Sequence, residues 1–277
     1  MQQSDDSVSL AVILVLYNSY ADTEAFLNAQ GSTKELLRFI VVDNTPHARV
    51  DQLALDRFSV RSDVTVLLAY PENLGYAGAA NFALQRLPEL AEYDYVALSN
   101  TDLAFDASAF QKVLTETKRE HTHVGAIAPR LTMRDEGEKP QLHYVEKPTR
   151  AHYAHLVRIF SNYPLTILHR LAADTKRRLG CSRNRKETPR FIFAPHGALM
   201  IFTRAYIAQT AGFAHPAFLF CEEVFVGLEC EKAGLACIFE PRLTYSHKNH
   251  GAMGLIPSRE IVGHLREAHK AVLPLLD

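Results

Sequence analysis

Short apolar runs alternate with polar, amphipathic stretches along the first half of the chain. The apolar runs occupy residues 8–16, 39–42, 64–69 and 95–98. A strand that is covered by helices on both faces has this continuous Val, Ile and Leu character, whereas a strand with one wet face alternates. Residues 22–28 and 77–87 lie between these runs and have helical spacing. The pattern therefore predicts βαβ units around a mostly parallel sheet.

The second half of the chain is less regular. Helices are predicted over 107–119, 222–233 and 259–273, and strands over 124–128 and 236–239. Asp106 is a candidate N-cap for the first of these helices, and Gly234 is a candidate stop for the second. Residues 191–202 form an apolar run that Pro195-His196-Gly197 interrupts. Residues 132–190 show little periodicity.

Length, charge and cysteine content narrow the class of protein. At 277 residues, one large α/β domain is the default expectation. The 30 basic and 31 acidic residues nearly balance, which gives no reason to expect nucleic acid as a partner. The apolar run 8–16 is far shorter than the roughly 20 residues that span a bilayer, and its flanks do not resemble a signal peptide. Four cysteines without a CxxC pair favour reduced thiols in a cytoplasmic protein.

Polar groups follow the first four predicted strands at the point where each strand ends. They are Tyr17-Asn18, Asp43-Asn44, Asn73 and Asn100-Thr101-Asp102. Ligands of open α/β sheets bind outside the carboxyl ends of the strands, so these groups predict one nucleotide site.

Several of these groups have a structural alternative. Asn100 and Asp102 are two residues apart, on the same side of an extended chain, and suit a divalent cation that also binds phosphates. Alternatively, Asp102 only starts a turn. Asp43 is placed to bind a nucleoside, or it forms an Asx-turn. Gly75 allows close approach of a ligand in front of the helix 77–87, although the spacing is not a dinucleotide fingerprint.

Candidate chemistry also appears in the second half. Glu222 and Glu223 open a helix, where acids are favoured by the helix dipole, or one of them acts as a general base. His247 and His250 form a pair that is too small for a zinc site. Residues 169–190 are strongly basic and form either a solvated face or a surface for anionic lipid or an acceptor diphosphate.

The order of these motifs resembles family 2 glycosyltransferases with the GT-A fold, of the rhamnosyltransferase-like, capsule or O-antigen type. The motifs are Leu14–Asn18, Val41–Asn44, Glu72–Asn81, Ser99–Asp102, Gly197–Met200 and Glu222–Gly234. The resemblance implies one domain over 8–254, with a nucleotide-binding half (8–103), an acceptor half (104–254) that contains the variable segment 132–190, and a C-terminal helix in 255–277.

The resemblance also implies roles for individual residues. Glu223 takes the position of the catalytic base with Glu222 beside it, while Asp102 and His247 hold Mn²⁺ or Mg²⁺. The implied nucleotide-binding residues are Leu16, Tyr17, Asn18, Asp43, Asn73, Gly75, Asn81, Asn100 and Thr101. Two departures from the family pattern concern the site: Asn100 replaces an acid in the metal motif, and Phe225 occupies a later acidic position.

The resemblance implies metal-dependent, inverting transfer of a sugar from a dTDP- or UDP-sugar to a glycan or glycolipid acceptor. Two alternatives stay open. A nucleotide-sugar-binding subunit with a decayed site is one, and a sugar-phosphate nucleotidyltransferase is the other, although the latter lacks a basic loop after the first strand. The expected location is the cytoplasm, with peripheral contact to an anionic membrane through 169–190.

Overall fold

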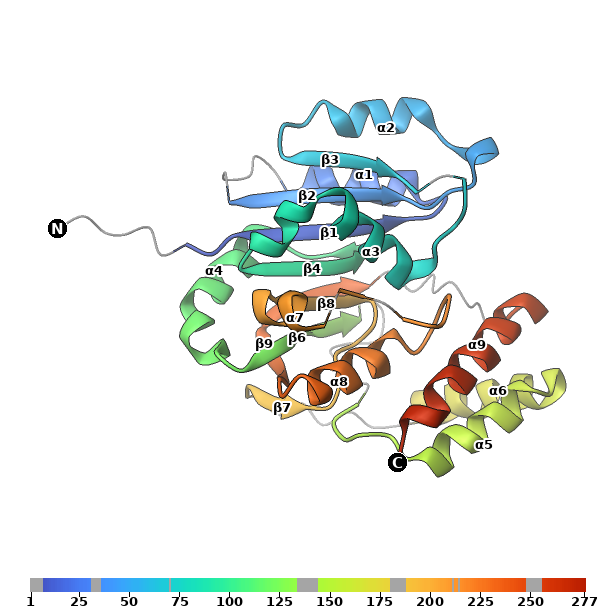
Figure 1. The fold of residues 1–277 in the computed structure, drawn as a ribbon. Coiled ribbons are helices and arrows are strands. Elements are labelled where there is room, and N and C mark those ends of the chain that lie inside the picture. The colour runs from blue at the N-terminus through green and yellow to red at the C-terminus, as the bar shows by residue number, and fades with distance from the viewer. Residues whose placement is uncertain are drawn as a thin grey trace.

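The computed structural model describes residues 7–30, 36–69, 71–133, 144–179, 188–210, 212–213, 215–247 and 256–277. Within these ranges a twisted mixed sheet of nine strands has helices on both faces (Figure 1). The strands are β1 (Leu10–Leu16), β2 (Leu37–Asp43), β3 (Val64–Leu68), β4 (Tyr95–Asn100), β5 (Leu103–Ala104), β6 (Val124–Met133), β7 (Arg190–Ile192), β8 (Leu199–Thr203) and β9 (Ala236–His247).

The first half of the sheet is parallel, as the sequence pattern predicts. Strands β3, β2, β1 and β4 lie side by side in that order and run in one direction. The second half is mixed, because β8 is antiparallel to both β4 and β6, whereas β6 and β9 are parallel. The short strands β5 and β7 are each antiparallel to β9.

The described helices are α1 (Tyr20–Ala29), α2 (Gln52–Ser59), α3 (Gly75–Arg86), α4 (Ala107–Thr117), α5 (Arg150–Phe160), α6 (Tyr163–Leu179), α7 (Arg204–Gln209), α8 (Glu222–Lys232) and α9 (Arg259–Val272). None of the helices in the described ranges is long and apolar enough to cross a bilayer.

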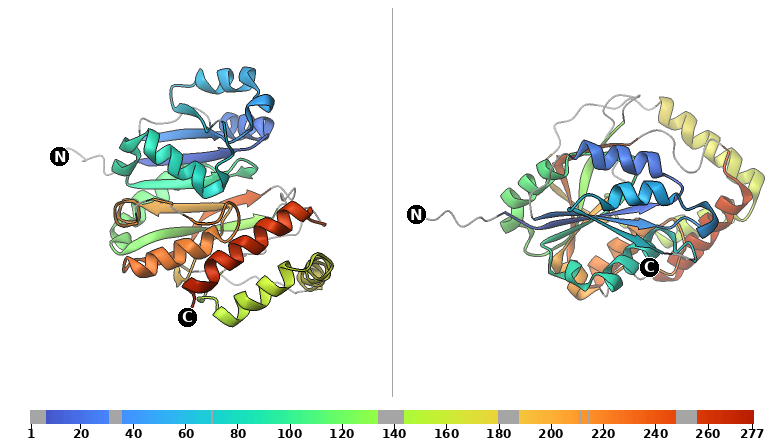
Figure 2. Two further views of the ribbon diagram at one scale, coloured as in Figure 1. Left: turned by 45° about the vertical axis from the view of Figure 1, so that its right-hand side comes forward. Right: turned by 90° about the horizontal axis from the view of Figure 1, so that it is seen from above.

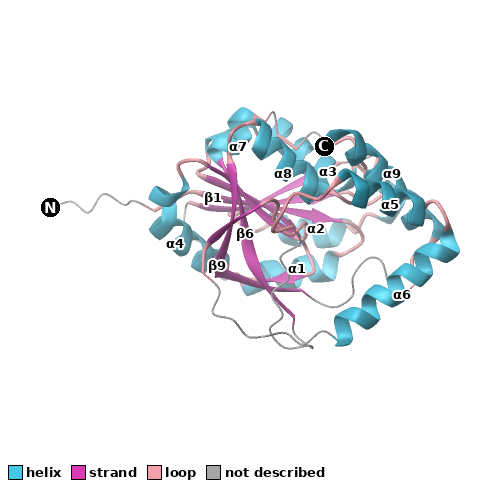
Figure 3. Ribbon diagram, turned by 90° about the horizontal axis from the view of Figure 1, so that it is seen from below, coloured by secondary structure: helices cyan, strands magenta, loops and turns pink. Residues whose placement is uncertain are grey.

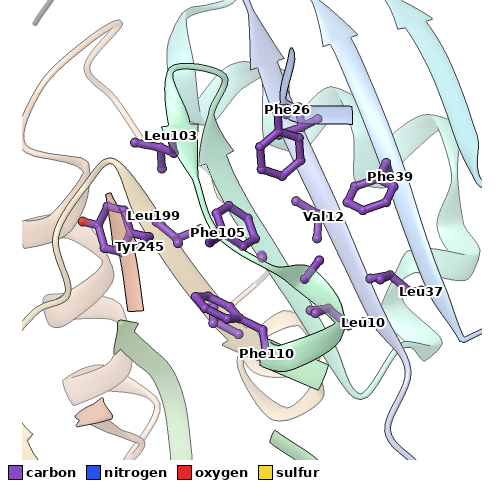
Figure 4. Packing of buried hydrophobic residues seen from close by; sticks show 14 of the residues in the cluster. Leu10, Val12, Phe26, Leu37, Phe39, Leu103, Phe105, Phe110, Leu199 and Tyr245 are labelled. Atoms are coloured by element: carbon purple, nitrogen blue, oxygen red, sulfur yellow. The ribbon is translucent and has the colours of Figure 1, made fainter. Parts of the chain in front are cut away.

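Alternation along β1 divides the core between the two faces of the sheet. Leu10, Val12 and Leu14 point to one face, where α1, α2 and α4 cover them (Figure 4). Ala11 and Ile13 point to the other face, which α3, α7 and α8 cover. Because both faces are buried, β1 carries the continuous apolar run that the sequence shows.

A third layer joins α5 and α6 to the C-terminal helix α9. Tyr153, Cys221, Phe225 and Val272 share one buried cluster, which links α5, α8 and α9. Two views show these helices together at one side of the sheet (Figure 2). The structure therefore has packed helices in the second half of the chain, where the sequence pattern indicated little order.

Most predicted helix ends agree with the structure. The Asp106 side chain accepts a hydrogen bond from the Ala109 N–H at 3.0 Å, which confirms its N-cap role. Gly234 has a φ of +67° directly after α8, as expected for a glycine that ends a helix. The run 191–202 divides into β7 and β8. Helices α2, α7 and the pair α5 and α6 were not predicted.

Candidate functional site

Parallel pairing places the polar strand ends at one edge of the sheet. Leu16 lies opposite Asp43 in the β1–β2 ladder, and Val15 lies opposite Asn100 in the β1–β4 ladder. The arrowheads of β1 to β4 all point to the same side of the molecule (Figure 1). The register therefore brings the four predicted strand exits to one edge, as the sequence analysis expects.

The Asp43 carboxylate is buried at the end of β2 and is held on both oxygens. The Tyr20 hydroxyl donates to Oδ2 at 2.8 Å, and the Thr45 N–H donates to Oδ1 at 2.9 Å. The Thr45 hydroxyl in turn accepts from the N–H of Asn18, whose φ of +52° is uncommon for a residue other than glycine. Asn18 and Asp43 thus belong to one hydrogen-bonded group.

An open cavity of about 400 Å³ lies beside this carboxylate. Its lining residues are Asp43, Thr45, His47, Val50, Gln52 and Leu68. The volume is within the range of small-molecule sites, and the lining combines apolar walls with a few polar groups. Tyr17 is half exposed near the same strand end, whereas the Leu16 carbonyl accepts from the N–H of Asn44 at 2.7 Å.

Asn44 and Asn73 shape the turn that leads into α3. The amide nitrogen of Asn44 donates to the Gly75 carbonyl at 2.8 Å, and its amide oxygen accepts from the Leu74 N–H at 3.1 Å. The Asn73 side chain accepts from the Gly75 N–H at 3.0 Å. Both asparagines therefore fix the helix start to the end of β2.

Gly75 permits the closest approach in this region. Its φ is +73°, and a Cβ at this position would lie 2.0 Å from the Phe218 carbonyl oxygen. The start of α3 therefore touches the loop that precedes α8. Asn81, on the next turns of α3, accepts a hydrogen bond from the Phe213 N–H at 2.7 Å. Its described contact is thus within the fold, and its nucleotide-binding role stays a prediction.

Asp102 and His247 come together although 145 residues separate them. The short strand β5 pairs Leu103 with His247 and brings the imidazole beside the carboxylate. His247 Nε2 lies 2.9 Å from Asp102 Oδ2, and both side chains are partly exposed. The turn before them is anchored, because the Thr101 and Ser19 hydroxyl oxygens lie 2.7 Å apart and the Asn100 N–H donates to the Ala198 carbonyl at 3.0 Å.

This pair fits two neighbouring ligands of one divalent cation. Adjacent ligands at about 2.1 Å from an octahedral ion lie about 3 Å apart. Among the described residues no group of three or more His, Cys, Asp or Glu side chains is assembled for a metal. One carboxylate and one imidazole leave positions for phosphate and water oxygens, which is typical of ions bound together with a substrate.

The two acids at the start of α8 differ in environment. Glu222 is buried, and its carboxylate accepts from the Phe220 N–H at 2.9 Å. Burial, followed by the charge of Glu223, raises the pKa of Glu222 to about 7. Glu223 is partly exposed, and its carboxylate lies 3.1 Å from the position that a Cβ on Gly197 would take. Glu223 is therefore the acid with access to solvent.

A strained turn presents these two acids. Phe220 and Cys221 have φ values of +74° and +63°, a conformation that side chains other than glycine rarely adopt. Cys221 is the N-cap residue of α8 and belongs to the buried cluster that links α5, α8 and α9. Such strain persists only where surrounding contacts hold it, and it is concentrated at functional sites.

Tyr76, at the start of α3, contacts the segment before β8. Its buried hydroxyl donates to the Ala198 carbonyl at 3.3 Å. Burial first, and then the charges of Glu222, Asp102 and Glu223 among others, raise the pKa of this phenol well above its ordinary value. The Tyr76 hydroxyl therefore reaches the segment before β8, in which Gly197 lies beside the Glu223 carboxylate.

Sequence reasoning missed several residues that complete the site. Tyr20 and Thr45 hold Asp43, Ser19 contacts Thr101, and Tyr76 donates to the Ala198 carbonyl. Their proximity to a motif in the sequence was the available signal, since each lies within a few residues of a predicted site position.

The comparison with protein families gives one match. The sequence profile described as "Glycosyl transferase family 2" matches residues 11–207, which is more than half of the chain. Two curated relatives from Mycobacterium tuberculosis strains, CDC 1551 / Oshkosh and H37Rv, are each named N-acetylglucosaminyl-diphospho-decaprenol L-rhamnosyltransferase. Each is 23% identical over 94% of this chain and 82% of the relative.

Solved structures with similar folds include the following three chains. GalNAc-T7 with UDP, GalNAc and Mn²⁺ has a TM-score of 0.64 and 13% identity over 97% of this chain, which spans about half (49%) of that protein. The mannosyltransferase PcManGT from Pyrobaculum calidifontis, with GDP-Man and Mn²⁺, has a TM-score of 0.55 and 16% identity, and the match covers 97% of this chain and 70% of PcManGT. TarS from S. aureus, residues 1–349, has a TM-score of 0.55 and 14% identity, and the match covers 96% of this chain and 72% of the TarS chain. The GT-A fold is thereby confirmed.

The raised pKa of Glu222 makes stability depend on pH. Its folded-state pKa of about 7 exceeds the ordinary value of 4.5, because the folded state favours the neutral carboxyl. The folded state is therefore most stable below about pH 4.5 and loses this contribution as the pH rises through 7. We expect Glu222→Gln, which stays neutral, to gain on the order of 3 kcal/mol in unfolding free energy relative to wild type between pH 4 and pH 9. Urea unfolding across this range measures it. The exposed control Glu260→Gln should follow wild type, and a Glu222→Gln curve parallel to wild type would contradict the assignment.

The close contact at Gly75 predicts an unequal effect of two alanine substitutions. Gly75 and Gly234 have nearly the same positive φ, so alanine costs roughly 1–2 kcal/mol of backbone strain at either position. Only Gly75 has a backbone atom in the path of the new Cβ, because nothing lies within 4 Å at Gly234. Gly75→Ala should therefore lose at least about 1 kcal/mol more than Gly234→Ala in urea unfolding. Equal losses would show that the loop before α8 yields freely.

Proposed function

The chain belongs to glycosyl transferase family 2, and on this basis we propose that it transfers a sugar from a nucleotide-diphosphate donor to a hydroxyl of a glycan or lipid-linked acceptor. One observation carries the proposal: a nucleoside-sized cavity at Asp43 and the Asp102–His247 pair lie at the strand ends, and the partly exposed Glu223 approaches Gly197, whose neighbour Ala198 accepts from the Asn100 N–H. These three features supply a donor pocket, a cation site and a base.

The cavity beside Asp43 is the proposed pocket of the donor's base and ribose. Each oxygen of this carboxylate already accepts one hydrogen bond, so each has a second lone pair for a donor group on the nucleoside. We propose a dTDP- or UDP-sugar, and rhamnose is the candidate sugar because the M. tuberculosis relatives are named rhamnosyltransferases. Tyr17, Asn18, Asn100 and Thr101 lie at the same strand ends.

Asp102 and His247 are the proposed ligands of Mn²⁺ or Mg²⁺. When bound, the ion would neutralise the charge that develops on the leaving diphosphate. A site of one carboxylate and one imidazole suits Mn²⁺ better than Mg²⁺, which prefers oxygen ligands. The neutral Asn100 lowers the charge of the site compared with a motif of two acids.

Glu223 is the proposed general base. It would accept the proton of the acceptor hydroxyl as that oxygen attacks the anomeric carbon opposite the leaving diphosphate, which inverts the anomeric configuration. Glu222 favours this role, because a carboxyl with a pKa near 7 is largely neutral at lower pH and adds little repulsion to the neighbouring charge. Two adjacent acids in different environments can therefore serve as one base and one buried support.

The two alternative functions have less support. The matched family is one of glycosyltransferases, which speaks against a sugar-phosphate nucleotidyltransferase. A decayed, non-catalytic subunit would not need to retain the pairing of Asp102 with His247 or the strained turn before Glu223. We therefore favour an active enzyme.

The proposed place of action is the cytoplasm, at the inner face of a membrane that holds the acceptor. The sequence analysis expects contact with anionic lipid through the basic segment 169–190. Residues 180–187 of this segment lie outside the described residues, so that contact stays a prediction.

Removal of the base should abolish transfer and leave donor binding intact. We expect Glu223→Gln to lower kcat by at least about a hundredfold, the usual weight of a general base. The assay measures nucleotide release from a panel of dTDP- and UDP-sugars with a lipid-linked acceptor and Mn²⁺. The matched control Glu231→Gln changes an exposed acid of the same helix and should keep normal turnover.

Thermal shifts with UDP and dTDP separate a binding defect from a catalytic one. The nucleotide that stabilises wild type should stabilise Glu223→Gln equally. Near-normal turnover of a folded Glu223→Gln would refute the base assignment. Nucleotide binding without transfer from any donor, in wild type, would instead favour the decayed subunit.

A further inference from the structure

Helix α6 presents a row of apolar side chains to solvent. Leu165, Leu168 and Leu171 are 43%, 63% and 41% exposed. Their spacing of three residues places them on successive turns of one face. On the opposite face Thr166 is fully buried, and its hydroxyl donates to the Ile159 carbonyl at 3.0 Å. The face that a water-soluble helix fills with charge is therefore apolar here.

The orientation of α6 is fixed by its packed face. The Tyr163 hydroxyl donates to the Pro257 carbonyl at 2.9 Å, and the Arg259 guanidinium lies 4.8 Å from the centre of the Tyr163 ring. The His169 and Phe160 rings also contact each other, with centroids 6.3 Å apart. Because these contacts come from α5 and from the start of α9, the leucine row cannot turn inward without breaking them.

The sequence around this row is strongly basic. Residues 150–179 contain six Lys or Arg residues and one acid, Asp174. The basic residues are Arg150, Arg158, Arg170, Lys176, Arg177 and Arg178. An apolar helix face with an excess of basic residues suits an anionic lipid surface. The same excess disfavours a second copy of this chain as the occupant, because two segments with an excess of like charge would meet.

The position of α6 also fits a membrane beside the site. Helices α5, α6 and α9 lie at the side toward which the strands β1 to β4 point (Figure 1), and α6 forms the outer rim there (Figure 3). A bilayer against α6 would lie on the side of the molecule where the strands β1 to β4 end.

We propose that α6 lies flat on an anionic bilayer, with Leu165, Leu168 and Leu171 inserted at the level of the lipid headgroups. The 17-residue helix is about 25 Å long and lies in the interface plane rather than across it. This proposal rests on the proposed function in one respect: a lipid-linked acceptor would require the enzyme to work at a membrane. Basic residues alone would bind at the surface, whereas this proposal requires insertion of leucine side chains.

The absence of tryptophan from the whole sequence permits a direct test. Leu168→Trp places a single tryptophan in the row, and Leu53→Trp places one on α2, where Leu53 is 73% exposed. The probe is vesicles of phosphatidylcholine with and without phosphatidylglycerol, some with brominated acyl chains. We expect a blue shift and bromine quenching for Leu168→Trp with phosphatidylglycerol vesicles only, and neither signal for Leu53→Trp.

Three outcomes would overturn the proposal. The first is unchanged fluorescence of Leu168→Trp with anionic vesicles. The second is emission that is already blue-shifted without vesicles, because the tryptophan would then be buried in the free protein. In a monomer another part of the chain would cover it, and in a dimer a second copy would. The third is equal quenching of Leu168→Trp and Leu53→Trp, which means non-specific adsorption.

A charged substitution separates membrane binding from the nucleotide site. Leu168→Glu should lower the vesicle partition coefficient by about tenfold or more, because the leucine insertion is lost. The thermal shift by UDP or dTDP should stay as in wild type, since Leu168 is outside the donor site. Normal vesicle binding by Leu168→Glu would refute insertion, whereas loss of transfer with intact vesicle binding would concern the proposed function alone.

Discussion

The location of the candidate site depends on the in-register pairing of parallel strands. Leu16 faces Asp43 and Val15 faces Asn100, so the three neighbouring strands β2, β1 and β4 end at one level. A shift of one residue would also move the buried side chains of β1 to the wrong face, which the packed helices on both sides do not permit. The same burial that stabilises the sheet therefore aligns the polar groups that follow it.

Contacts between residues far apart in the sequence bring the remaining site residues to this edge. The two-residue strand β5 against the end of β9 places His247 beside Asp102, and the Gly75–Phe218 contact sets the loop before α8 against the start of α3. The Tyr76 hydroxyl, at the start of α3, donates to the carbonyl of Ala198, next to the glycine that Glu223 approaches. The two sides of the candidate site are thus held by backbone contacts as well as by side chains.

The sequence allowed the parallel half to be predicted because each local signal agreed with the fold. Strands buried on both faces are largely apolar, and Asp43 ends β2 while Asp102 follows β4 after one residue. The proximity of Glu223 to Gly197 could not be predicted, because it depends on how α8 packs against the loop before β8. Helix α5 buries residues at helical spacing, but its many His and Arg residues obscured this pattern in the sequence. The exposed leucines of α6 weaken amphipathic patterning further, since the apolar face is turned to solvent.

The proposed site binds one divalent cation, through Asp102 and His247, together with one nucleotide diphosphate. Pulsed electron paramagnetic resonance of Mn²⁺ bound together with UDP or dTDP tests it most directly. We expect couplings to phosphorus and to an imidazole nitrogen, with only the nitrogen coupling lost in His247→Ala and both kept in the exposed control His123→Ala, which lies just before β6. Phosphorus coupling without any nitrogen coupling in the wild-type protein would contradict the assignment of His247, and Mn²⁺ that shows neither coupling would contradict the site as a whole.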